Sequence, residues 1–172
     1  MAPNKENEKL IYMVYAGLFA AMTALLTATL HIPVGNGYIH CGDAVIYLAA
    51  AMLPLPYAIG ASAIGGMLAD VLSGYVSYAL PTFLIKGLLA LTFAAVGGTR
   101  KLEKKRVFAM ILCGIVSIIG YWITAVILYG GWAAQFIGTA PGNAVQAIGS
   151  GIVYSVVALA MERIHDPKLK ML

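Results

Sequence analysis

Three charged residues stand within or at the edge of the long apolar runs of this sequence: Asp43, Asp70 and Lys86. A charge near the centre of a lipid bilayer costs at least about 2.5 kcal/mol on insertion scales, so such residues are usually paired or functional. One interpretation is structural: Asp70 and Lys86 form an ion pair, and Asp43 caps the start of a helix. The other is that Asp70 or Lys86 hydrogen-bonds a polar solute in a water-filled cavity.

A second group of polar side chains shares one helical face near the end of the sequence. Its members follow one another at intervals of three or four residues and are Asn143, Gln146, Ser150 and Tyr154. Because this face is too polar to point at lipid, we expect it to face the interior of a bundle. There it forms either hydrogen bonds between helices, worth about 0.6 kcal/mol each, or contacts with a ligand, which the amides of Asn143 and Gln146 favour.

The segment HIPVGNGYIHCGD, residues 31–43, separates the first two apolar runs and contains no Lys or Arg. We interpret it as a lid over a pocket, with Asn36 and Gly37 in its turn and Tyr38 and His40 facing inward. Exposed loop histidines that bind nothing are an equally good interpretation of its two histidines, and two histidines alone do not make a metal site.

Aromatic residues are concentrated in and near the segments that lack basic residues. They are Tyr38, Tyr75, Tyr78, Tyr129 and Trp132, with Tyr121 and Trp122 about two helical turns away. We assign about half of them to the aromatic belt found at membrane interfaces. The remainder indicates a pocket that stacks against a flat or ring-shaped solute.

The composition indicates the elements that must position these residues. Of the 172 residues, 61% are hydrophobic and 10% are charged, with a mean hydropathy of +0.87, whereas soluble domains are about 25% charged. Because each span takes about 20 residues, we expect an all-α bundle of six transmembrane helices in a single domain, 1–172. The expected spans are 10–30, 43–55, 57–73, 81–97, 107–129 and 142–162.

The number of crossings depends on the short run at 43–55, which ends on Pro54 and Pro56. Five spans and one re-entrant hairpin also fit this region. With a cytoplasmic amino terminus and six spans, ten of the eleven Lys and Arg residues fall on the inner side, and the eleventh, Lys86, lies within a span. The positive-inside rule therefore predicts that both termini are cytoplasmic.

No enzyme signature is present in the sequence, which lacks H-E-x-x-H, G-x-S-x-G and a Gly-Lys-Ser/Thr phosphate loop. We therefore expect no catalytic residue, no metal site and no cofactor. Cys41 and Cys113 are expected at different membrane depths, too far apart for a disulfide. The net charge of +4 fits anionic lipid headgroups, so we expect no nucleic-acid partner.

Three segments carry a resemblance to a known family. They are AGLFAAMTA on the first expected helix, IHCGDAVIYLAAAMLP at the second, and IGGMLADVLSGYVSYALPTFLIKGLLA across the third and fourth. In the last, Gly-Gly, Asp, Gly-Tyr, Pro-Thr and Lys are similar in order and spacing to the pattern of the S components of energy-coupling factor (ECF) vitamin transporters. The resemblance implies a subunit that captures a vitamin or vitamin precursor from outside and joins a transmembrane T component and two ATPases, which use the ATP.

The resemblance also implies roles for individual residues. Ala16, Ala20 and Ala24 correspond to the family's contact with the T component, although small residues at this spacing also suit packing within the chain. The family's outer cavity, together with the charge of Asp70, gives as candidate substrate-binding residues Asn36, Tyr38, His40, Asp70, Lys86, Tyr121, Trp122, Trp132, Gln135, Asn143 and Gln146. Expected solutes are water-soluble ring compounds such as a pyrimidine, a pyridoxine-like molecule, a flavin or a deazapurine.

Two other functions fit the sequence. One is a small self-sufficient secondary carrier or channel, in which Asp70 and Lys86 form an ion or proton relay. The other is a purely structural membrane subunit with a dry interior. In each case we expect a multi-pass protein of the cell (plasma) membrane, the inner or sole membrane of a prokaryote.

Overall fold

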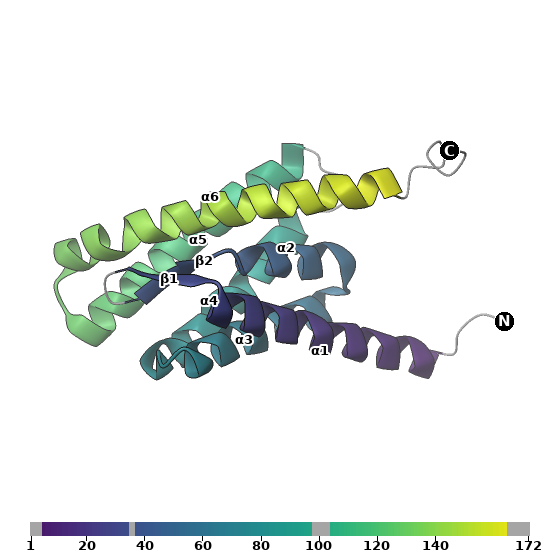
Figure 1. Ribbon diagram of the computed structural model, residues 1–172, viewed down its shortest axis with the longest axis horizontal. Helices are drawn as coiled ribbons and strands as arrows, with labels where there is room; N and C mark the ends of the chain where they lie inside the picture. Colours follow the sequence, from purple (N-terminus) through teal and green to yellow (C-terminus); the bar gives the residue numbers. More distant parts are fainter. Residues whose placement is uncertain (1–4, 35–36, 98–103, 165–172) are drawn as a thin grey trace.

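The computed structural model describes residues 5–34, 37–97 and 104–164 of the chain. In these ranges the chain forms six α-helices and one antiparallel β-hairpin (Figure 1). The elements are α1 (Lys5–Thr29), β1 (His31–Val34), β2 (Gly37–His40), α2 (Asp43–Met52), α3 (Leu55–Leu72), α4 (Val76–Gly97), α5 (Lys104–Tyr129) and α6 (Trp132–Ile164). The prediction of an all-α bundle with six helices is confirmed.

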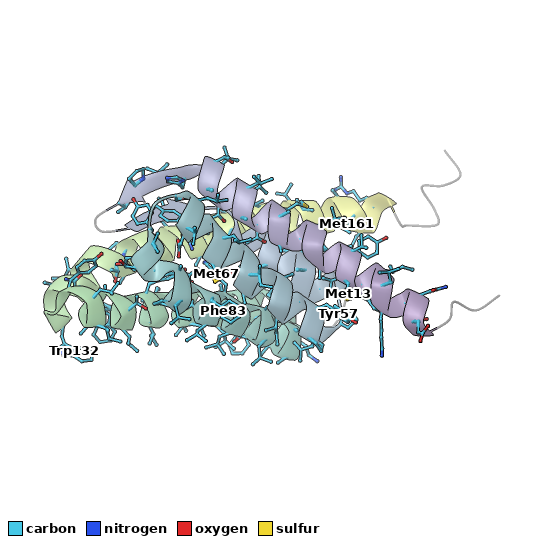
Figure 2. All side chains as sticks on the ribbon, turned by 90° about the horizontal axis from the view of Figure 1, so that it is seen from below. Met13, Tyr57, Met67, Phe83, Trp132 and Met161 are labelled. Carbon is cyan, nitrogen blue, oxygen red and sulfur yellow. The ribbon has the colours of Figure 1, made fainter. Side chains whose placement is uncertain are left out.

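Five of these helices, all except α2, are long and apolar enough to cross a membrane. Their outer surfaces carry large apolar side chains, such as Leu80 and Ile127, which are 70% and 77% exposed. Lipid tails suit such a surface, whereas water does not. α1 begins and α6 ends at the same end of the bundle (Figure 1), and Met13 and Trp132 lie toward opposite ends (Figure 2). The chain is therefore a multi-pass membrane protein.

The short helix α2 lies at the centre of the bundle. Its ten residues extend for about 15 Å, roughly half of the 30 Å hydrocarbon layer. Seven of the ten are buried, and α2 contacts α1, α3, α4 and α6. The β-hairpin precedes it in the chain and lies against α1 and α6. α2 and the hairpin thus occupy the place of the expected second span.

Five helices begin before the expected spans, and in α4 and α6 the earlier start brings a proline inside the helix. α4 starts at Val76 and contains Pro81, which removes one backbone hydrogen bond early in the helix. α6 starts at Trp132 and contains Pro141, because the left-handed backbone of Gly130 and Gly131, with φ of +73° and +76°, reverses the chain within two residues. The 33 residues of α6 extend for about 50 Å, longer than the hydrocarbon layer.

Helices α1 and α3 pack closely through small residues. A Cβ atom added to Gly65 of α3 would lie only 2.7 Å from the carbonyl oxygen of Ala20 and 2.8 Å from Cβ of Thr23. Ala20 and Ala24 of α1 are correspondingly buried. Because only glycine permits this approach, Gly65 sets the distance between the two helices.

An aromatic cluster fills the bundle on the far side of α2. The rings of Tyr47 and Phe93 stack with centroids 4.9 Å apart, and Tyr154 meets both of them edge-on. The guanidinium of Arg106, which is buried at the start of α5, donates a hydrogen bond to the Tyr154 hydroxyl. This cluster joins α2, α4, α5 and α6 and leaves the other end of α2 free to form part of a polar site.

Candidate binding pocket

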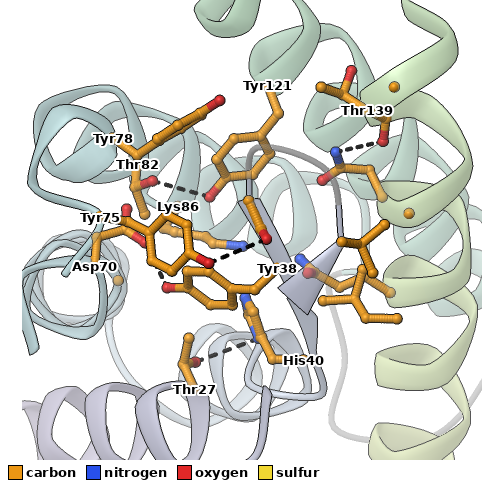
Figure 3. A pocket seen from close by; sticks show the side chains of 18 residues that line it. Thr27, Tyr38, His40, Asp70, Tyr75, Tyr78, Thr82, Lys86, Tyr121 and Thr139 are labelled. Carbon is orange, nitrogen blue, oxygen red and sulfur yellow. Dashed lines mark hydrogen bonds between the residues drawn. The ribbon is translucent and has the colours of Figure 1, made fainter. Parts of the chain in front are cut away.

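A pocket opens among the helices beside the β-hairpin (Figure 3). It contains about 650 Å³ of space free of protein atoms, counting the part open to solvent. The hairpin and five helices contribute to its wall. The lining residues are Thr27, Val34, Gly37, Tyr38, Ile39, His40, Gly66, Asp70, Tyr75, Tyr78, Thr82, Lys86, Tyr121, Gly138, Thr139, Gly142, Asn143 and Gln146.

Lys86 pairs with Asp43 and not with Asp70. Its Nζ atom lies 2.6 Å from Asp43 Oδ1, and Gln146 Nε2 donates to Asp43 Oδ2 at 2.9 Å. The N-cap of α2 is Gly42, and it has no side-chain hydrogen bond. The prediction of an Asp70–Lys86 pair with Asp43 as a cap is therefore wrong. The observed pairing has a physical reason. The short helix α2 brings Asp43 into the interior of the bundle, and a buried carboxylate needs a cation there.

The position of the Lys86 side chain depends on Gly66 of the neighbouring helix α3. A Cβ atom at Gly66 would lie 2.6 Å from Cγ of Lys86 and 3.1 Å from Cγ2 of Thr82. The lysine stem therefore packs directly on the α3 backbone, and its ammonium reaches Asp43 across the bundle. The two glycines at 65–66 thus hold α1 on one side and Lys86 on the other.

Asp70 has a different partner and one unused oxygen. The Tyr38 hydroxyl donates to Asp70 Oδ1 at 2.5 Å, which ties the hairpin to α3. Asp70 Oδ2 is buried and accepts no hydrogen bond from the described residues. The Thr82 hydroxyl lies beside the carboxylate and is 3.2 Å from the Tyr121 hydroxyl. Asp70 therefore presents an unsatisfied acceptor in the wall of the pocket.

Four tyrosines form an aromatic wall around these charges. The ring of Tyr38 lies 4.8 Å from that of Tyr75, and the ring of Tyr78 lies 6.4 Å from that of Tyr121. The ammonium of Lys86 stands 5.3 Å from the centre of the Tyr121 ring, a distance at which a cation is attracted to the ring face. Rings combined with a few fixed polar groups are typical of sites for flat, polar solutes.

The hairpin is held over the pocket by polar contacts to the helices. His40 Nδ1 accepts the backbone N–H of Gly42 at 2.9 Å and lies 3.4 Å from Thr27 Oγ1. Burial, with a smaller effect of Lys86, lowers the pKa of His40 to about 3, so its ring is neutral. Burial and the carboxylate of Asp70 raise the pKa of Tyr38 above its usual range, so its hydroxyl remains a donor. Tyr75 adds a bond to the Gly37 carbonyl at 3.4 Å.

The structure brings seven of the predicted site residues together in this pocket: Tyr38, His40, Asp70, Lys86, Tyr121, Asn143 and Gln146. Asn36 lies outside the described residues, and Gly37, predicted in the turn, belongs to β2 and pairs with Val34. The polar face of α6 also points inward as predicted, with Gln146, Ser150 and Tyr154 buried.

Three predicted residues do not line the pocket: Trp122, Trp132 and Gln135. The ring of Trp122 packs edge-on against Trp132 and Phe136, and its Nε1 donates to the Trp132 carbonyl at 2.9 Å. Trp132 is 62% exposed. The early start of α6 places Trp132 and Gln135 on the first turn of this helix, at the tip of the α5–α6 pair. Trp122 of α5 packs against Trp132 from the neighbouring helix, and both tryptophans suit a membrane interface.

Several lining residues were not among the candidates. Tyr75 and Tyr78 are among the aromatic residues concentrated near the segments that lack Lys and Arg. Thr82 precedes Lys86 by one helical turn on the same face, so the sequence contains a signal for all three residues. Thr27 and Thr139 have no comparable signal, because they reach the pocket only through the packing of α1 and α6. Asp43 does not line the pocket, but it forms an ion pair with the lining residue Lys86.

Two further expectations concern partners and metals. Ala16 is half-buried, whereas Ala20 and Ala24 are buried against α3, so contact between these alanines and another protein stays a prediction. Cys41 and Cys113 are free thiols. Within the described ranges no group of three His, Cys, Asp or Glu side chains is placed to hold a metal ion.

Comparisons with known proteins place the chain in a family. The model of the family described as "ECF-type riboflavin transporter, S component" matches residues 7–163. A Pyrococcus woesei protein described as "Uncharacterized protein in gap 3'region" is 32% identical over 136 residues, which are 78% of this chain and 88% of that protein.

A solved structure titled "Structure and mechanism of the S component of a bacterial ECF transporter" has the same fold. The TM-score is 0.68 at 21% identity, over 96% of this chain and 99% of the other. S components bind substrate and are not enzymes. From the family match over nearly the whole chain, we conclude that this protein belongs to the S components of ECF-type riboflavin transporters.

Proposed function

We propose that this S component binds riboflavin, or a closely related flavin, in the tyrosine-walled pocket beside the β-hairpin. The observation that carries the proposal is the match of residues 7–163 to a riboflavin-type family in a chain whose pocket combines four tyrosine rings with amide, hydroxyl and charged groups. A flavin is a flat ring system with N–H and C=O groups along one edge and a polyhydroxylated chain, so it needs both kinds of contact.

Polar groups on opposite walls suit the two parts of such a molecule. On α6, Asn143 Nδ2 donates to the Thr139 carbonyl at 3.0 Å, which orients the amide and leaves its oxygen available to a hydroxyl donor. On α3 and α4, Asp70 and Thr82 face the pocket beside Tyr78 and Tyr121. The hairpin closes the space between these walls, and it must shift to admit a solute as large as a flavin.

The chain delivers its solute with partner subunits. We infer a transmembrane T component and two ATPases, because the family is part of ECF-type transporters and the sequence has no phosphate-binding loop of its own. The pairing of Lys86 with Asp43, and not with Asp70, does not favour the alternative of a carrier with an Asp70–Lys86 relay.

The orientation in the membrane follows from charge. The starts of α1 and α5 and the end of α6 carry the basic residues, so these ends face the cytoplasm under the positive-inside rule. The pocket then opens to the outside of the plasma membrane of a prokaryotic cell. Both termini are cytoplasmic in this arrangement.

Titration of the purified protein with riboflavin, followed by quenching of flavin fluorescence, tests the proposal. We expect saturation at one riboflavin per chain. Asn143→Ala removes one hydrogen bond of about 1 kcal/mol and weakens binding about fivefold. Gln135→Ala, on the same helix but outside the pocket, is the matched control and leaves binding unchanged. Absence of saturable quenching by the folded protein contradicts the proposal.

A further inference from the structure

The charges in and around the pocket do not balance. One cation, Lys86, faces two carboxylates, Asp43 and Asp70. Lys86 is 2.6 Å from Asp43 and forms its ion pair there, and His40 is neutral. The remaining described residues of the lining carry no formal charge at neutral pH. By formal charge, the described residues in and around the pocket therefore include one more carboxylate than cation, and the carboxylate without an ion pair among them is Asp70.

The two carboxylate oxygens of Asp70 differ in their hydrogen bonds. Its Oδ1 atom is occupied by the Tyr38 hydroxyl, whereas Oδ2 is buried without a partner among the described residues. The residue is 4% exposed and Oδ2 is buried, so bulk water does not readily satisfy that oxygen. A buried acceptor left without a donor is destabilising, and more so when it is charged. A bound solute that brings a donor to Oδ2 removes this cost.

We propose that Asp70 is a specificity-determining residue: it accepts a hydrogen bond from an N–H or O–H group of the solute and excludes solutes that carry a phosphate. The inference rests on the proposed flavin-binding function and narrows it to unphosphorylated vitamers. The imide N–H of the flavin ring and the hydroxyls of its side chain are suitable donors. A phosphate monoester carries a charge of about −1.5 to −2 at pH 7, and the pocket offers it no free cation in its described part.

Riboflavin and riboflavin 5′-phosphate are the probes for this test, since they share the ring system and differ in the phosphate. Like charges separated by about 6 Å at an effective dielectric constant near 20 weaken binding by about 100-fold. We therefore expect the wild-type protein to bind riboflavin 5′-phosphate at least about tenfold more weakly than riboflavin. We expect Asp70→Asn, which keeps the shape and an acceptor for Tyr38, to reduce this ratio at least about fivefold.

Glu8→Gln provides the matched control, because it removes one negative charge from the exposed start of α1 and leaves the ratio unchanged. Equal affinity of the wild type for both probes overturns the inference while the flavin-binding function stands. An unchanged ratio in the folded Asp70→Asn variant also overturns it. A wild-type protein that binds neither probe shows instead that the proposed function itself is wrong, and the inference fails with it.

Discussion

Removal of the Lys86 ammonium should destabilise the bundle far more than the loss of a surface charge. Both side chains of the Lys86–Asp43 pair are 2% exposed. In Lys86→Met the carboxylate of Asp43 keeps only the Gln146 donor at 2.9 Å and becomes a buried charge without a cation. Breaking one partner of a buried pair typically costs about 3–5 kcal/mol, a factor of about 100 to 5,000 in the unfolding equilibrium.

A second substitution isolates the electrostatic part of this cost. In the double variant Lys86→Met with Asp43→Asn, the unpaired charge is gone and Gln146 retains an acceptor. We expect at least half of the lost stability to return, because replacing both members of a buried pair is often close to neutral. Lys9→Met, on the exposed start of α1, should change stability by less than about 1 kcal/mol.

The buried thiol of Cys113 supplies the assay. Cys113 is 0% exposed and Cys41 is exposed, so in a Cys41→Ser background a thiol-reactive fluorophore labels Cys113 only after unfolding. With a slope of about 2–4 °C per kcal/mol for a chain of this size, Lys86→Met should lower the midpoint of thermal labelling by about 6–20 °C. A midpoint equal to that of the wild type, or a double variant no more stable than Lys86→Met, would show that the buried ion pair does not stabilise the bundle in this way.

Three more perturbations test the packing and polarity around the pocket. Gly66→Ala should displace the Lys86 stem and lower the same labelling midpoint, whereas Gly60→Ala, with no atom within 4 Å of the added Cβ, should not; equal midpoints would contradict the contact. Tyr38→Phe removes the donor to Asp70 and should weaken flavin binding about tenfold, and an unchanged affinity in a fluorescence titration would argue against a hairpin held by this bond. The pKa of His40 is about 3 in the folded chain, against an ordinary value of 6.5. Between these pH values the unfolded state binds a proton that the folded state does not, so the stability contributed by neutral His40 falls as the pH drops from about 6.5 toward 3. Thermal melts between pH 7 and 5 should show a steeper loss of stability for the wild type than for His40→Asn, and parallel curves would contradict this.

The helices and the inward polar face of α6 could be predicted from the sequence because both depend on local periodicity. Gln146, Ser150 and Tyr154 lie on one face of any helix that contains them, so their burial needs only the knowledge that this helix packs against others. The positions of α1, α3 and α5 follow in the same way from the lengths of their apolar runs.

The partner of Lys86 could not be predicted, because it depends on which helix fills the centre of the bundle. Asp70 and Lys86 lie on consecutive helices, which makes them the natural pair from the sequence, whereas Asp43 is 43 residues from Lys86. Only the burial of the short α2 brings Asp43 to the ammonium. The position of Trp132 outside the pocket likewise follows from the chain reversal at Gly130 and Gly131. This turn starts α6 ten residues before the predicted span.

We propose that this S component holds a flavin in the pocket beside the hairpin. Native mass spectrometry of the protein purified from cells supplied with riboflavin tests this proposal, because it identifies whatever small molecule is retained. We expect one riboflavin per wild-type chain, and less retained riboflavin in Asn143→Ala but not in Gln135→Ala. A folded protein that carries a different solute, or that emerges with no bound molecule and takes up no added riboflavin, would contradict it.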